Sequence, residues 1–181
     1  MRTALWIVAG ILLGGIIHIL VILSVPAVAT QNLWSRITAL APENKLVLLP
    51  PLKPGEANPL QLDPALSYAV CRLNLKSGPG VLTGTLPDAF WSLAIYTPSG
   101  AVAYSTTNRD GIGKNLNLGI FNADQTHLLA EQEIEVADGL LIVESSSDDV
   151  FVVIRLLAPY EVVRPRYEKA LAGIACGNIK E

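Results

Sequence analysis

The sequence predicts a mainly β protein, in which an N-terminal transmembrane helix is followed by an antiparallel β-sandwich or barrel-like domain with a short C-terminal helix. Of the 181 residues, 51% are hydrophobic and 16% are charged, and no charged side chain lies between Thr3 and Gln31. After residue 68, short runs of alternating apolar and polar residues are separated by Gly, Pro, Asn and Asp, which is typical of antiparallel strands.

The N-terminal segment is long enough to cross a membrane. Residues 4–25 form an uncharged, mostly apolar stretch of 22 residues, and a helix needs about 20 residues to span a hydrocarbon core of about 30 Å. A cleaved signal peptide has an apolar region of only about 7–15 residues before a small-x-small site. Ala27-Val28-Ala29 offers such a site, so cleavage after Ala29 stays open. The length favours an uncleaved signal anchor over residues 1–29.

The orientation of this anchor is predicted from its positive charges and from the signal-like order of its segments. Arg2 and the terminal amine lie on one side, and Arg36 and Lys45 lie on the other, so the distribution of positive charge is nearly balanced. The short N-terminal tail and the signal-like order favour an N-terminus in the cytoplasm and a domain outside it.

Two glycines and a histidine lie along one side of the apolar helix. Gly10, Gly14 and His18 are spaced four residues apart, and small residues let membrane helices approach closely. One interpretation is a helix–helix contact face, with His18 hydrogen-bonded to a partner helix. The alternative is a plain anchor in the bilayer, in which the spacing has no role.

Residues 30–62 are expected to connect the anchor to the domain. Residues 32–40 place Leu33, Trp34, Ile37 and Leu40 on one helical face, which predicts a short amphipathic helix with Trp34 at the membrane interface. The many prolines between residues 50 and 59 predict an extended linker. The compact domain is therefore expected to begin at Asp63 and to span residues 63–181.

The domain is expected to hold eight strands and one helix. The last strand is apolar almost throughout, so we expect it to be central in its sheet. Pro165 opens a helix over residues 166–172, which Gly173 ends. The expected strands cover residues 69–75, 81–86, 90–96, 101–105, 116–121, 133–137, 140–144 and 150–157.

The most polar segment is the loop of residues 108–115. Arg109 offers a planar fork to an anion and Asp110 lies beside it, so both are candidate ligand contacts. The loop fits neither a phosphate-binding loop nor an EF-hand calcium loop. The alternative is a plain surface connection. Trp91 is a further ligand-contact candidate if it lines a pocket, and a core residue if it does not.

The residue types that bind metals are scarce. His127 is the one histidine outside the apolar segment, and we expect it on the surface. Glu131, Glu133 and Glu135 would share one face of a strand, where a cation or only solvent would meet them. The sequence therefore predicts no metal and no cofactor. Residues 30–181 carry 12 basic and 16 acidic side chains, which argues against nucleic-acid binding.

The two cysteines are expected to pair. Cys71 lies on the apolar face of the first long strand, and Cys176 follows the C-terminal helix, which must dock to bury Leu171 and Ile174. An oxidising compartment outside the cytoplasm permits the bond. The alternative is two unpaired thiols, with Cys71 acting as a small core residue.

The order of several segments resembles a known bacterial family. These are Gly-Gly-Ile-Ile-His-Ile at residues 14–19, Leu-Trp-Ser-Arg-Ile at 33–37, Asp63-Pro64, Ala-Val-Cys-Arg-Leu-Asn-Leu at 69–75 with Gly78-Pro79, and Phe-Trp-Ser-Leu-Ala-Ile-Tyr at 90–96. In this order they resemble the "domain of unknown function 1254" family. The resemblance implies a membrane-anchored β-rich domain at the bacterial inner membrane, on its periplasmic or extracellular side. It implies no reaction and no catalytic residue.

Two classes of function follow from this reading. The first is a binding or interaction module of the bacterial envelope, with an unknown ligand. The second is a hydrolase-like envelope enzyme that uses the polar loop around Arg109 and Asp110 together with His127. The second would require these side chains to meet in one pocket. A helper subunit that works through its membrane helix is a third possibility.

Overall fold

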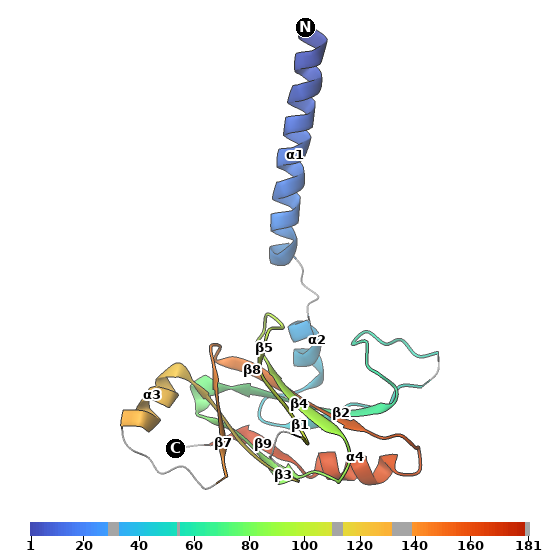
Figure 1. Ribbon diagram of the computed structural model, residues 1–181, viewed down its shortest axis with the longest axis vertical. Coiled ribbons are helices and arrows are strands. Elements are labelled where there is room, and N and C mark those ends of the chain that lie inside the picture. The colour runs from blue at the N-terminus through green and yellow to red at the C-terminus, as the bar shows by residue number, and fades with distance from the viewer. Residues whose placement is uncertain (29–32, 54, 110–113, 132–138, 180–181) are drawn as a thin grey trace.

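The computed structural model describes residues 1–28, 33–53, 55–109, 114–131 and 139–179. Helix α1, Arg2–Val28, extends away from the rest of the protein (Figure 1). Its residues Arg2–Val25 are long and apolar enough to cross a membrane, and none of them is buried against the domain. The expected apolar helix is therefore present, and a signal sequence would have the same character.

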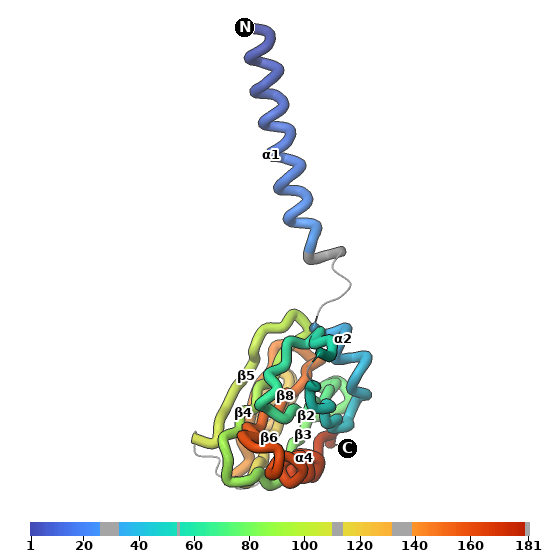
Figure 2. Tube along the Cα trace, turned by 90° about the vertical axis from the view of Figure 1, so that its right-hand side faces the viewer, coloured from blue at the N-terminus to red at the C-terminus, as the bar shows by residue number. Residues whose placement is uncertain are grey.

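The C-terminal part of the chain folds into two facing sheets (Figures 1 and 2). The first sheet has the strand order β1 (Leu46–Leu48), β2 (Leu66–Asn74), β8 (Asp149–Leu157), β4 (Trp91–Tyr96) and β5 (Val102–Thr107). The second has the order β7 (Leu141–Ser145), β6 (Asn115–Asn122), β3 (Gly80–Thr85) and β9 (Ala175–Asn178). This confirms the expected mainly β fold, with β8 central in its sheet.

The main core lies between the two sheets. Trp91, which is 1% exposed, packs there among inward-facing aliphatic side chains of both sheets. Ala69, Cys71 and Leu73 of β2, and Leu75 just after it, point into this core, as the period of two predicted. Burying each such aliphatic side chain contributes about 1.5–3 kcal/mol. The structure therefore supports the expectation that Trp91 is a core residue and not a ligand contact.

A second apolar layer covers the outer face of the first sheet. Tyr68 and Val70 of β2 and Phe151 and Val153 of β8 point to this face, away from the main core. Helix α2, Leu33–Leu40, and the residues around Leu49 pack over them. Strand β1 also pairs with β2, with Leu46 opposite Cys71.

These contacts place residues N-terminal to the expected boundary at Asp63 inside the packed unit. Ile37 is 3% exposed and Ala41 is fully buried, so α2 is held on the sheet rather than free at a membrane exit. The Trp34 and Phe151 ring centroids lie 5.8 Å apart, so Trp34 packs on the sheet. The apolar outer faces of β2 and β8 are the physical reason, because they need a cover.

One strand pair is parallel, where the sequence predicted antiparallel pairs throughout. Helix α3, Ala123–Glu131, follows β6 directly, in a stretch to which the sequence assigned neither a helix nor a strand. β7 then pairs parallel with β6, as a connection through a helix allows. Glu131 ends this helix and is not on a strand. The strand expected at residues 133–137 lies outside the described residues, as do Glu133 and Glu135.

The C-terminus closes the sandwich. Helix α4, Arg164–Ala172, has Pro165 in its first turn and Gly173 after its end, close to the expected bounds. β9 follows as an additional strand and pairs with β3, with Cys176 opposite Leu82. The expected Cys71–Cys176 disulfide is present, with Cα atoms 6.6 Å apart. It joins β2 of one sheet to β9 of the other.

Candidate functional site

The side chains of the expected polar loop do not form a described site. Arg109 is exposed in the turn after β5, where its backbone N–H donates to Thr107 Oγ1 at 3.2 Å. His127 is exposed on α3, and neither side chain lines a hollow described below. Asp110 lies outside the described residues. Among the residues that the structure describes, no group of three or more His, Cys, Asp or Glu side chains could hold a metal ion.

The face of α1 that carries Gly10 and Gly14 is open. A side chain at either glycine would meet nothing within 4 Å. His18 lies on the same helix, four residues after Gly14, and is exposed. A partner helix has room to approach here, and the contact through these three residues stays a prediction.

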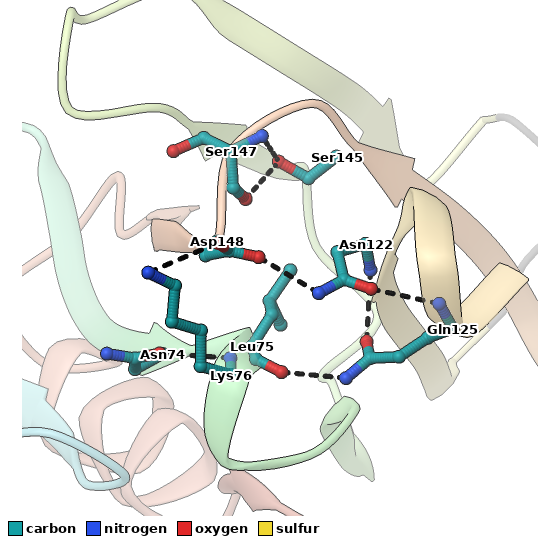
Figure 3. Close-up of polar contacts among 8 residues, drawn as sticks. All are labelled: Asn74, Leu75, Lys76, Asn122, Gln125, Ser145, Ser147 and Asp148. Carbon is teal, nitrogen blue, oxygen red and sulfur yellow. Dashed lines mark hydrogen bonds and ion pairs between the residues drawn. The ribbon is translucent and has the colours of Figure 1, made fainter.

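A polar network joins three parts of the chain at one end of the sandwich (Figure 3). Asn122 and Gln125 cap the start of α3 reciprocally: each backbone N–H donates to the other's side-chain oxygen, at 2.9 and 3.0 Å. Asn122 Nδ2 also donates to Asp148 Oδ1 at 2.9 Å, and Gln125 Nε2 donates to the Leu75 carbonyl at 2.7 Å. Lys76 Nζ lies 3.7 Å from Asp148 Oδ2.

These contacts indicate a structural role for the network. Its side-chain donors and acceptors are engaged with each other or with the backbone, so they hold the turn after β2, the start of α3 and the β7–β8 turn together. The close-up shows Asn122 and Lys76 reaching Asp148 from two sides, and Gln125 reaching the Leu75 carbonyl (Figure 3). A satisfied cluster of this kind fixes local geometry and leaves its groups less available to a substrate.

The strongest candidate site is an apolar groove between α2 and the proline-rich loop of residues 50–62. Its volume is about 500 Å³, within the range of about 300–1,000 Å³ that is usual for small-molecule sites. One wall is formed by Ala39 and Leu40 of α2, the floor by Leu49, and the other wall by Ala57 and Leu60 of the loop. The polar side chains that line it, among the described residues, are Arg36, Glu56 and Asn58.

The loop wall of this groove is held in place by hydrogen bonds. Asn58 Nδ2 donates to the Leu62 carbonyl and Leu62 N–H donates to Asn58 Oδ1, both at 2.8 Å. Arg36 Nη1 donates to the Pro59 carbonyl, which ties α2 to the loop. A hydrogen bond therefore links the two walls before any ligand binds, and such preorganisation lowers the entropy cost of binding.

A second hollow of about 260 Å³ continues from the groove over the outer face of the first sheet. The two share Leu49, Leu60 and Leu62 as lining residues, so they lie on either side of one leucine ridge. Tyr96 also lines the second hollow, and its ring stacks on Phe151 with centroids 5.1 Å apart. Arg155, another lining residue, donates from Nη2 to the Tyr96 hydroxyl at 2.6 Å.

A third hollow, of about 620 Å³, lies on the other side of the proline-rich loop against the start of α4. Its charged lining residues are of both signs, Lys53 and Arg164 against Glu56 and Glu161. Arg164 is already engaged, since Nη2 donates to the Pro64 carbonyl at 2.8 Å. This hollow offers no uniform charge or apolar surface that would select one class of ligand.

The groove was not predicted, because the prolines between residues 50 and 59 indicated a linker. A signal was present in the strands instead. Tyr68 and Val70 on the second face of β2, and Phe151 and Val153 on that of β8, are apolar, which requires a further layer over this sheet. The neighbouring proline-rich segment was the nearest candidate for that layer.

Comparison with known proteins shows the fold alone. No protein-family model matches the chain, and no curated protein matches it. The crystal structure of the VPA0106 protein from Vibrio parahaemolyticus is similar over 65% of this chain, with a TM-score of 0.53 and 13% sequence identity. The match covers 28% of that protein, so this chain spans less than a third of its length. The crystal structure of an uncharacterized protein from Burkholderia cenocepacia matches 61% of this chain and 31% of its own, with 12% identity and a TM-score of 0.38.

Proposed function

We propose that the protein is a single-pass, membrane-anchored module on the extracytoplasmic side of a bacterial inner membrane, and that it binds an apolar ligand in the groove between α2 and residues 50–62. The proposal includes membership of the domain of unknown function 1254 family. One observation carries the binding function: a preformed apolar groove stands beside the helix that follows the anchor.

Two further features support the location. Residues Arg2–Val25 satisfy the length and composition of a membrane span. The Cys71–Cys176 bond links the two sheets, and such bonds form and persist in oxidising compartments outside the cytoplasm. Together they favour an anchored domain that is exported.

The location is tested on the full chain in bacterial cells. We expect a reporter that is active only after export to be active when fused after Glu181. We also expect N-terminal sequencing of the membrane-purified protein to begin at the original N-terminus. A start at Thr30 would show that the segment is a cleaved signal, and an inactive but well-expressed fusion would reverse the orientation.

The binding function is tested by hydrogen exchange on the full chain in lipid nanodiscs. The probes are decanoate and a blocked Leu-rich tetrapeptide, each below its aggregation concentration. We expect at least one probe to slow exchange in residues 33–62, and the Ala57→Trp variant, which fills the groove, to abolish the protection. Ala130→Trp is the matched control, because Ala130 is exposed on α3 away from the groove. Equal exchange with and without both probes would contradict the proposal.

A further inference from the structure

We infer that the groove accepts an acyl chain of a phospholipid from the membrane in which α1 is anchored. This inference rests on the proposed function and names the ligand class of the same groove. It depends on the distance between groove and membrane, on the shape of the apolar surface and on one arginine at the rim.

The short connection between α1 and α2 keeps the groove near the bilayer. α1 ends at Val28 and α2 begins at Leu33. Five Cα steps separate them, which reach at most about 18 Å when fully extended. The groove wall is α2 itself, with Arg36, Ala39 and Leu40 in its length of about 12 Å. If α1 spans the membrane, these two lengths keep the groove within about 30 Å of the bilayer surface.

The shape of the apolar surface fits a long flexible chain. The groove and the second hollow share Leu49, Leu60 and Leu62, so they adjoin and together offer a longer apolar surface than the groove alone. Apolar lining favours a hydrocarbon over a polar solute, at about 25 cal/mol for each Å² removed from water. A bilayer supplies such chains at a far higher local concentration than the aqueous phase does.

Arg36 provides a group for the phosphate of the lipid. It lines the groove and is fixed by its bond from Nη1 to the Pro59 carbonyl. A guanidinium has five N–H donors, and this bond uses one of them. Its planar fork suits a phosphate oxygen pair, and every glycerophospholipid carries a phosphate. Glu56 on the loop wall repels negative charge, so it disfavours a ligand that carries a further negative group besides the phosphate.

The experiment uses the full chain in nanodiscs of phosphatidylethanolamine and phosphatidylglycerol. A few per cent of the phospholipid carries a photoreactive diazirine at the end of one acyl chain. After irradiation, labelled peptides are mapped by mass spectrometry. We expect labels in two places: in α1, which serves as the internal control, and in the peptides that hold Leu40, Leu49 and Leu60.

Two groove-filling variants test the location of the second label. Ala39→Trp and Ala57→Trp fill the groove from opposite walls, and both positions are exposed, so neither disturbs the core. We expect each to lower labelling of residues 33–62 by at least about tenfold relative to α1, equivalent to about 1.4 kcal/mol. Ala130→Trp should leave it unchanged. Arg36→Gln should lower it, and Arg36→Lys should restore part of it.

Labelling confined to α1, or labelling of residues 33–62 that survives both groove-filling variants, would overturn the inference. Its failure is distinguishable from that of the proposed function. If decanoate or the tetrapeptide still protects the groove while no bilayer lipid labels it, the module binds a ligand from solution and only the lipid inference falls. If Arg36→Gln labels as strongly as the native chain, the phosphate contact is wrong.

Discussion

Breaking the Cys71–Cys176 bond should lower the free energy of unfolding by about 4.7 kcal/mol. The bond closes a loop of 105 residues, which includes most of both sheets. In the chain-entropy model, opening a loop of about 100 residues frees that much conformational entropy in the unfolded chain at 25 °C. For a domain of this size, 1 kcal/mol corresponds to about 2–4 °C, so we expect the melting temperature to fall by about 10–20 °C.

The measurement compares oxidised and reduced native protein in nanodiscs, followed by near-ultraviolet circular dichroism during heating. Using the same chain in two redox states isolates the bond from any change in side-chain volume, which matters because Cys71 is fully buried. A Cys71→Ala/Cys176→Ser variant should match the reduced protein to within about 1–2 kcal/mol. Hydrogen exchange should show the loss first in β9, the edge strand that the bond holds.

A fall of less than about 2 °C on reduction would refute this reasoning. It would mean that the unfolded chain retains enough structure for the cross-link to remove little of its conformational entropy, or that β9 stays in place through its pairing with β3 alone. Two free thiols in protein prepared from its native compartment, labelled under denaturing conditions, would refute the bond itself and weaken the case for export.

The packing of α2, the network and the core give three further expectations, all measured by urea unfolding. Ile37→Ala should lower the free energy of unfolding by about 2–4 kcal/mol, because this side chain is 3% exposed and packs against the outer face of the first sheet. The control is Leu33→Ala, whose side chain is 42% exposed and which should change stability by less than about 0.5 kcal/mol. An equal loss of stability in both variants would show that α2 does not pack there. Gln125→Ala should cost about 1–2 kcal/mol through the lost cap and the unpaired Leu75 carbonyl, and exposed His127→Ala on the same helix is the control, which should be near neutral. Trp91→Ala should cost about 3–5 kcal/mol, and a value under about 1 kcal/mol would contradict its place in the core.

Periodicity predicted the strands well because the faces of these sheets differ in polarity. Seven of the eight expected strands correspond to observed ones. The period of two also oriented Cys71 toward the core, from which its bond to Cys176 follows. β9 was missed because Ala-Cys-Gly-Asn has little strand propensity, and its pairing with β3 and the disulfide decide its conformation instead. α3 was missed because its sequence has no strong apolar stripe and it buries none of its side chains.

The groove was beyond the reach of the sequence for a different reason. It is made by three segments: α2, the residue Leu49 after β1, and the loop of residues 50–62. Local composition labels the last of these a linker, since its prolines exclude a helix and a strand ladder. Only the long-range requirement that Tyr68 and Phe151 be covered brings the three together. The candidates that the sequence did offer, Arg109 and Trp91, are separated by burial, one exposed and the other in the core.

The register of β2 against β8 governs when the protein can fold. Asn74, the last residue of β2, pairs with Asp149, and β8 ends only at Leu157. At synthesis rates of about 5–20 residues per second, β2 must wait about 4–17 s for its neighbour to emerge. During that interval Val70 and Leu73, both buried in the finished domain, lack their cover. A nascent chain in this state is prone to aggregate, so the yield of folded protein should depend on a holding chaperone that occupies β2 until β8 is available to pair with it.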